Sequence, residues 1–65
     1  MSTNYEDIIP QKILFSIREV EEMGAIKTDM LKKLITQGQI EIVKIGTKVH
    51  ISRPELIRFL NDNTI

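Results

Sequence analysis

Residues 42–51 have the sequence Ile-Val-Lys-Ile-Gly-Thr-Lys-Val-His-Ile, and this stretch decides the fold. Its β-branched residues flank Gly46-Thr47, which suits a two-residue hairpin turn with glycine at the position of positive φ. The predicted register pairs Ile45 with Lys48, Lys44 with Val49, Val43 with His50 and Ile42 with Ile51. One face of this hairpin, predicted to be inward, carries Ile42, Val49 and Ile51, and the other carries Val43, Ile45, Lys48 and His50.

The segment before the hairpin has the pattern of an amphipathic helix over residues 28–37. Thr28 is the predicted N-cap, Asp29 is favourable in the first turn, and Gly38 ends the helix in the left-handed conformation. The stripe that faces the core consists of Leu31, Leu34 and Ile35. The opposite face is centred on Asp29, Lys33 and Thr36 and is flanked by Lys32 and Gln37. A helix this short depends on packing for its stability.

Two more helices are predicted from capping boxes, in which a Ser caps the helix and a Glu three residues later reaches back to it. The first box is Ser16-Ile17-Arg18-Glu19, and its helix buries Ile17, Val20 and Met23 before a break at Gly24-Ala25. The second box is Ser52-Arg53-Pro54-Glu55, where proline is tolerated in the first turn. The apolar stripe of this last helix consists of Leu56, Ile57, Phe59 and Leu60.

Residues 1–12 show no clear periodicity and include Pro10, so we expect a flexible N-terminal arm or an added peripheral turn. Residues 13–65 then form the single folded domain that this length allows. The apolar run Ile13-Leu14-Phe15 is long enough to add a short strand to the hairpin. The predicted fold class is therefore α+β, with three short helices and two or three antiparallel strands.

The charges are distributed unevenly along a chain whose formal net charge is zero. Residues 27–53 contain six basic and two acidic residues, a net charge of +4, whereas acidic residues gather before residue 23. Phosphate attraction is local, because salt screens charges over about 8 Å, so one basic face can bind a polyanion although the whole chain is neutral.

Several function classes find little support in the composition. The chain has no Cys and one His, so disulfides, thiolate metal sites and His-rich metal clusters are excluded. General acid–base or nucleophilic catalysis needs a positioned pair in a pocket, and the scattered carboxylates indicate none. No apolar run approaches the roughly 20 residues that span a bilayer. We therefore expect a soluble, intracellular domain without cofactor, metal or catalytic activity.

The same residues resemble the excisionase-like winged helix-turn-helix family, which is related to the MerR-type DNA-binding domain. The resemblance covers about 45 residues and is carried by residues 15–19, residues 30–35 with Gly38, residues 43–46, and Ile51 through Phe59-Leu60. It differs at the cap of the second helix, where Lys27 stands in place of the usual Ser, and the predicted groove helix contains no arginine. Lysine makes no rigid bidentate contact to guanine, so phosphate contacts and DNA shape would supply much of the affinity.

The resemblance implies a second helix in the major groove and a hairpin, the wing, that touches phosphate or the minor groove. Carried over by position, the groove helix contributes Thr28, Asp29, Lys32, Lys33 and Thr36, and the wing contributes Lys44, Thr47 and Lys48. Lys27, Gln37 and Arg53 complete the candidate DNA-binding residues, because they lie in the same basic segment. The implied partners are double-stranded DNA, an integrase or recombinase, and further copies of the chain on DNA, in the cytoplasm of a bacterium or of a phage host.

Three uses stay open at this point. The first is an excisionase or recombination directionality factor of a mobile element, and the second is a small transcriptional regulator. The third is a protein-interaction module without DNA binding, which the neutral total charge and the acidic first helix favour. Two of the candidate residues also have a structural role as an alternative to contacting DNA. Lys33 can pair with Asp29 on the same helix, and Arg53 can cover the start of the last helix instead of reaching phosphate.

Overall fold

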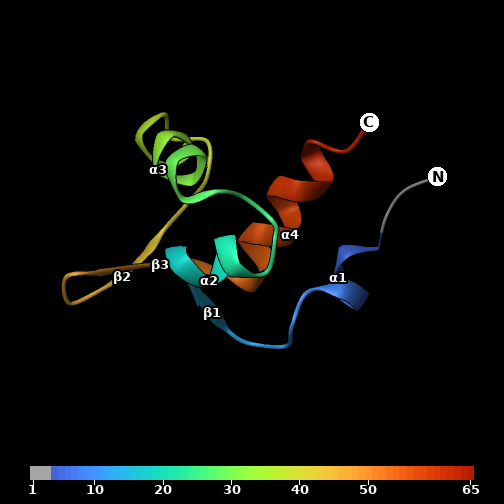
Figure 1. The fold of residues 1–65 in the computed structure, drawn as a ribbon, viewed down its shortest axis with the longest axis horizontal. Coiled ribbons are helices and arrows are strands. Elements are labelled where there is room, and N and C mark those ends of the chain that lie inside the picture. Colours follow the sequence, from blue (N-terminus) through green and yellow to red (C-terminus); the bar gives the residue numbers. More distant parts are fainter. Residues whose placement is uncertain (1–3) are drawn as a thin grey trace.

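The predicted hairpin is present in the computed structural model, which describes residues 4–65 (Figure 1). Strands β2 (Val43–Ile45) and β3 (Lys48–Ser52) pair antiparallel in the predicted register, and Gly46 in the turn has a φ of +61°. The ladder of the described strands stops at Val43, so the expected fourth pair, Ile42 with Ile51, does not form. The chain turns away there because the backbone N–H of Glu41 donates to the Glu55 carboxylate at 2.7 Å.

A third strand, β1 (Leu14–Ser16), lies on the other edge of β3 and gives the sheet order β1-β3-β2. The expected short strand before the first helix is thereby confirmed, shifted by one residue. Phe15 pairs with Ile51 across this ladder, and both side chains are buried. Because side chains alternate along a strand, these two residues fix which face of the sheet is covered by helices.

The two helices that directly follow strands β1 and β3 begin at the positions that the predicted capping boxes indicated. In α2 (Ile17–Glu22) Ser16 and Glu19 form a complete capping box. In α4 (Arg53–Asp62) the Ser52 side chain accepts from the Glu55 amide, which is half of the predicted box. The other half is missing because the Glu55 carboxylate contacts Glu41 and Arg58 instead.

The N-terminal segment contains a helix that the sequence analysis missed. Residues 4–12 do not extend as an arm, because α1 (Tyr5–Ile8) packs against α4 and Ile9 belongs to the core. The alternative expectation, a peripheral turn, describes this segment better, and residues 1–3 of the expected arm lie outside the described part. Helix α1 has only four residues, which is too short for a helical periodicity to be recognised in the sequence. Only the N-cap residue Asn4 marks the start of this helix.

Residues 4–65 thus form a small α+β fold with four helices, one more than expected, and a three-stranded antiparallel sheet. Figure 1 shows α3 (Thr28–Thr36) and the hairpin turn toward one end of the long axis, and α1 and the C-terminus toward the other. None of the helices in this described part has the length and apolarity needed to cross a membrane. The core between the sheet and the helices consists of Ile9, Phe15, Val20, Leu31, Ile40, Ile51 and Leu56.

Candidate functional site

Helix α3 begins at Thr28, as expected, but its cap differs from the prediction. Lys27 is the N-cap residue and makes no side-chain capping bond, so the prediction that Thr28 caps the helix is wrong. The Thr28 amide instead donates to the carboxylate of Glu21 in α2, with an N···O distance of 2.7 Å. This bond lowers the pKa of Glu21, because a donor at the positive end of a helix stabilises the charged carboxylate. The contact ties α2 to the start of α3.

The outward face of α3 is the one that the periodicity predicted. Leu31 is fully buried and Leu34 and Ile35 are half-buried, so this stripe fixes the rotation of the helix. Gly38 follows the C-cap Gln37 with a φ of +72°, which ends the helix as expected. The exposed residues of this face are Asp29, Lys32, Lys33, Thr36 and Gln37, whereas Thr28 is half-buried.

The hairpin places a second group of polar side chains beside its turn. Lys44, Thr47 and Lys48 are all exposed, and residues 42–53 contain no acidic residue. Lys48 lies opposite Ile45 and Lys44 lies opposite Val49, so the two ammonium groups extend from opposite faces of the ribbon. The tip of the hairpin therefore carries a positive charge on each face.

The basic residues fall into two groups that differ in their contacts. Lys12 pairs with Glu19, Arg18 pairs with Glu22 at 3.6 Å, and Arg58 pairs with two carboxylates. Five lysines form no ion pair within residues 4–65, and the pair of Lys33 with Asp29, which the sequence offered as an alternative, is not made. These five are Lys27, Lys32 and Lys33 at α3, and Lys44 and Lys48 on the hairpin. They can approach an anion without first breaking an internal pair.

Arg53, also among the candidate DNA-binding residues, differs from these five lysines because its guanidinium makes hydrogen bonds inside the molecule. Its guanidinium donates to the backbone carbonyls of Pro10 at 3.1 Å, Glu6 at 2.7 Å and Ile9 at 3.2 Å. Arg53 therefore fastens the N-terminal segment to the start of α4. The sequence left two roles open for Arg53, and the geometry supports the one in which it covers the start of the last helix. The reason is that three backbone carbonyls already accept hydrogen bonds from its planar guanidinium.

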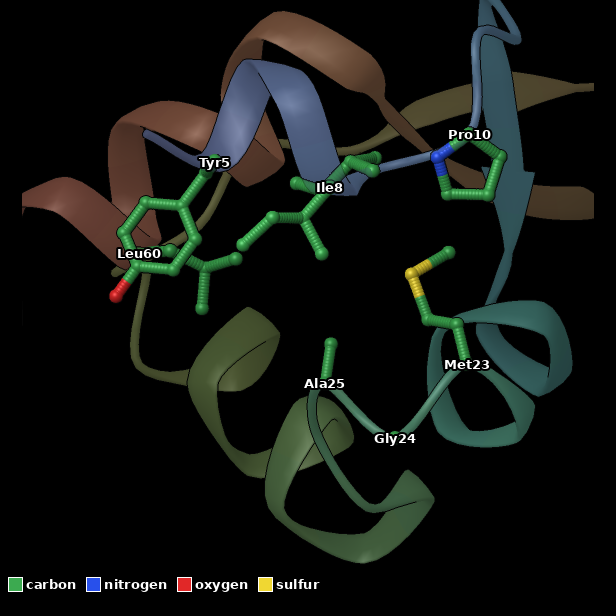
Figure 2. A pocket seen from close by; sticks show the side chains of 8 residues that line it. Tyr5, Ile8, Pro10, Met23, Gly24, Ala25 and Leu60 are labelled. Atoms are coloured by element: carbon green, nitrogen blue, oxygen red, sulfur yellow. The ribbon is translucent and has the colours of Figure 1, made fainter. Parts of the chain in front are cut away.

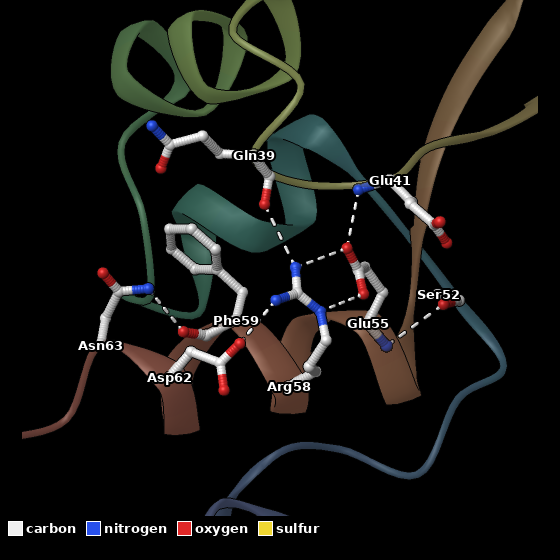
Figure 3. A network of polar contacts seen from close by, with 8 residues as sticks. All are labelled: Gln39, Glu41, Ser52, Glu55, Arg58, Phe59, Asp62 and Asn63. Atoms are coloured by element: carbon white, nitrogen blue, oxygen red, sulfur yellow. Dashed lines mark hydrogen bonds and ion pairs between the residues drawn. The ribbon is translucent and has the colours of Figure 1, made fainter.

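Sequence reasoning missed Arg58, which holds the connection between α3 and β2. Figure 3 shows its guanidinium between Glu55, Asp62 and the carbonyl of Gln39, with N···O distances of 2.7, 2.7 and 3.1 Å. This network keeps the pKa of Glu55 below its ordinary value and raises the pKa of Arg58. The spacing of the three side chains along the helix predicts their pairing. The contact to the connection is set by the fold and has no sequence signal.

A concave apolar region lies at the other end of the molecule. It has a volume of about 280 Å³ and is lined by α1, the turn after α2 and Leu60 of α4 (Figure 2). The Tyr5 hydroxyl at its rim is hydrogen-bonded to Thr64. Its other lining residues are Ile8, Ile9, Pro10, Met23, Gly24 and Ala25, so the region offers apolar contact and no charged group.

The five unpaired lysines come from two elements that Figure 1 shows at one end of the molecule, α3 and the hairpin. All five are exposed. Comparison with protein-family models, curated proteins and solved structures gives no match for this chain. The candidate site therefore consists of two groups of exposed lysines, one on α3 and its N-cap and one on the hairpin.

Proposed function

We propose that this chain binds duplex DNA, with α3 in the major groove and the hairpin on the neighbouring backbone and minor groove. The observation that carries the proposal is the division of the basic residues. Within residues 4–65, the side chains of four of the nine make ion pairs or hydrogen bonds, and the five lysines whose side chains make neither lie on α3, at its N-cap and on the hairpin. Cations left unpaired on a helix and an adjacent ribbon are typical of a surface that neutralises phosphates.

The dimensions of α3 agree with this role. An α-helix with its side chains is about 10–12 Å across and the major groove is about 12 Å wide, so α3 can lie in the groove with its polar face toward the bases. Lys33 lies at the centre of that face and Lys32 on its flank. Because lysine is a flexible point charge, these contacts give affinity for the backbone more than sequence discrimination.

The order of the elements supports a winged helix-turn-helix arrangement. In this arrangement α2 and α3 are the two helices, joined by a turn in which Gly24 has a φ of +81°, and β2 and β3 are the wing. Together with the sequence resemblance, this order favours an accessory protein of a mobile element that assists a recombinase. A small transcriptional regulator would use the same surface, and binding to the ends of an element, as opposed to a promoter, distinguishes the two.

The competing use, a protein-interaction module that docks through its acidic helix, is less well supported. The acidic side chains of α2 have partners inside the chain: Glu19 contacts Lys12, Glu21 accepts from the Thr28 amide, and Glu22 contacts Arg18. Helix α2 therefore presents few uncompensated carboxylates to a basic partner.

The salt dependence of duplex binding tests the proposal. If all five lysines contact phosphates, a plot of log affinity against log salt has a slope of about −4 to −5, measured by fluorescence anisotropy with a labelled duplex. Replacing Lys32 and Lys33 with Gln makes the slope shallower by about 2 and weakens binding. The matched control removes two charges elsewhere, in Lys12→Gln/Arg18→Gln, and leaves the slope unchanged. A salt-independent wild-type signal, or equal effects of the two double variants, contradicts the assignment.

A further inference from the structure

The hairpin tip combines its lysines with exposed apolar side chains, which is unusual for a surface that contacts only phosphate. Ile45, the residue before the turn, is 55% exposed, and Ile42 and Val43 are each 38% exposed. None of these side chains belongs to the core or to the partly buried shell around it. A β-branched residue at the end of a ribbon is left in water unless it contacts a partner.

The turn itself is narrow. Gly46 has no side chain, and a Cβ built there would meet no atom within 4 Å, so the tip is open on that side. Ile45 lies directly beside this glycine and opposite Lys48, whereas Lys44 extends from the other face. The tip of the hairpin is thus narrow and presents the apolar side chain of Ile45, with Lys48 on the same face of the ribbon and Lys44 on the other.

The minor groove of DNA matches this arrangement. It is about 6 Å wide and is bounded on both sides by phosphates, so a turn that enters it brings one lysine toward each backbone. Proteins that insert Ile, Leu, Met or Phe from such a position separate two stacked base pairs and kink the duplex. The absence of acidic residues from residues 42–53 removes the repulsion that would oppose entry.

We propose that Ile45 is an apolar wedge, inserted by the hairpin into the minor groove at a base step, and that it bends the duplex. Lys44 and Lys48 hold the tip in the groove through the two backbones. Steps that unstack easily, such as TA, are the preferred sites. This inference rests on the proposed duplex binding, and it adds a DNA deformation that phosphate contacts alone do not produce.

The test uses a 20-base-pair A·T-rich duplex with a fluorescence energy-transfer pair at its ends and 2-aminopurine at a central TA step. At saturating wild-type protein we expect a bend of at least about 20° and a rise in 2-aminopurine fluorescence, because the base is unstacked. Ile45→Ala and Ile45→Thr, the second of which keeps the β-branch of the strand, abolish the rise and most of the bend. Both bind about three- to tenfold more weakly, because little apolar area is buried by the truncated side chain.

Two controls separate the wedge from the basic surface. Ile13→Ala is the matched truncation, because Ile13 is 84% exposed and lies outside the hairpin, and it behaves as the wild type. Lys44→Gln/Lys48→Gln binds more weakly and with a shallower salt slope, but once saturated it still bends the duplex. Circular dichroism melting confirms that each variant is folded.

The possible outcomes separate this inference from the proposed function. Binding by the wild type without bending or unstacking, or full bending by both Ile45 variants, overturns the wedge and leaves duplex binding intact. A wild type that does not bind the duplex overturns both. If the wild type dimerises in sedimentation without DNA and Ile45→Thr is monomeric, the apolar tip binds a second copy of the chain and the wedge is again overturned.

Discussion

The two ends of this molecule use their basic residues in different ways. At one end, which we call the clasp, Arg53 fastens the N-terminal segment to α4. Arg58, in the middle of α4, joins this helix to the connection before β2. At the other end, the basic end, α3 and the hairpin carry lysines without an ion pair in the described chain. Within residues 4–65, the side chains of all three arginines make ion pairs or hydrogen bonds, and those of five of the six lysines make neither.

The difference follows from the chemistry of the two side chains. The planar guanidinium of arginine holds several carbonyl or carboxylate oxygens at once, which suits a fixed contact between segments distant in sequence. The ammonium of lysine is a flexible, hydrated point charge, which suits a surface that exchanges water and ions for phosphates. The absence of arginine from α3 therefore agrees with the proposal that lysines contact DNA, whereas Arg53 and Arg58 hold segments of the fold together.

The largest expected effect concerns the support of the basic end. Leu31 is fully buried and is the core residue of α3, so Leu31→Ala removes its packing and leaves a cavity. We expect a loss of about 2–5 kcal/mol in the free energy of unfolding, measured by urea denaturation. A 65-residue domain has a total stability of the same order, so this variant is largely unfolded and does not bind DNA.

Ile13→Ala, the same kind of truncation at an exposed position, is the control and changes the stability little. If Leu31→Ala instead keeps the denaturation midpoint of the wild type, α3 is not anchored by this residue. The basic surface would then lack the rigid helix that the comparison of the two ends assumes.

A smaller effect is expected at the clasp. Arg53→Met keeps the length of the side chain but removes its bonds to three backbone carbonyls. We expect a loss of about 1–3 kcal/mol in the free energy of unfolding and faster amide hydrogen exchange in the N-terminal segment, residues 5–9. The affinity of the folded variant for duplex DNA stays within about twofold of the wild type, because the guanidinium is held away from the proposed surface.

Arg18→Met is the matched control, because this arginine pairs only loosely with Glu22 at the surface. A fall in affinity for Arg53→Met that is larger than its fall in stability would return Arg53 to the DNA-binding residues. The distinction between the clasp and the basic end would then be lost.

The sequence predicted the basic end better than the clasp, for physical reasons. The register of the hairpin and the inward stripe of α3 depend on local periodicity and on Gly38 and Gly46, which the sequence displays directly. The clasp depends on contacts between residues more than 40 positions apart, such as Arg53 with the carbonyl of Glu6. Backbone carbonyls have no sequence signal, so α1, the bonds of Arg53 to the N-terminal segment and the contact of Arg58 with Gln39 could not be predicted. The spacing of Arg58 with Glu55 and Asp62, in contrast, is that of ion pairs on one helix face.

The cap of α3 shows the same limit at closer range. Thr28 has the residue type of a cap, but Glu21 lies seven positions earlier and offers a charged acceptor to the helix start. Once α2 and α3 are packed together, the Glu21 carboxylate accepts a hydrogen bond at the start of α3, and the Thr28 hydroxyl does not cap the helix. Tertiary structure decided the cap at this position, although local preference had indicated another residue.

The smallest expected effect concerns this joint between α2 and α3 and depends on pH. The bond from the Thr28 amide lowers the pKa of Glu21 below its ordinary value of 4.5. A carboxylate with a lowered pKa in the folded state stabilises the fold fully above that ordinary value, and this contribution is lost as the pH falls through the folded pKa. Melting temperatures measured from pH 7 to pH 3 should therefore fall less steeply below pH 4.5 for Glu21→Gln than for the wild type.

Glu22→Gln removes a neighbouring carboxylate that contacts only Arg18, and it serves as the control for the loss of one charge from α2. Glu19 and Glu55 also have lowered pKa values and remain in both variants, so the acid sensitivity that they cause is common to both. A steeper acid dependence in the wild type than in Glu21→Gln, with Glu22→Gln matching the wild type, assigns the difference to the cap. If both variants lose the same acid sensitivity, the effect reflects the overall charge of α2, and the start of α3 is held by its packing alone.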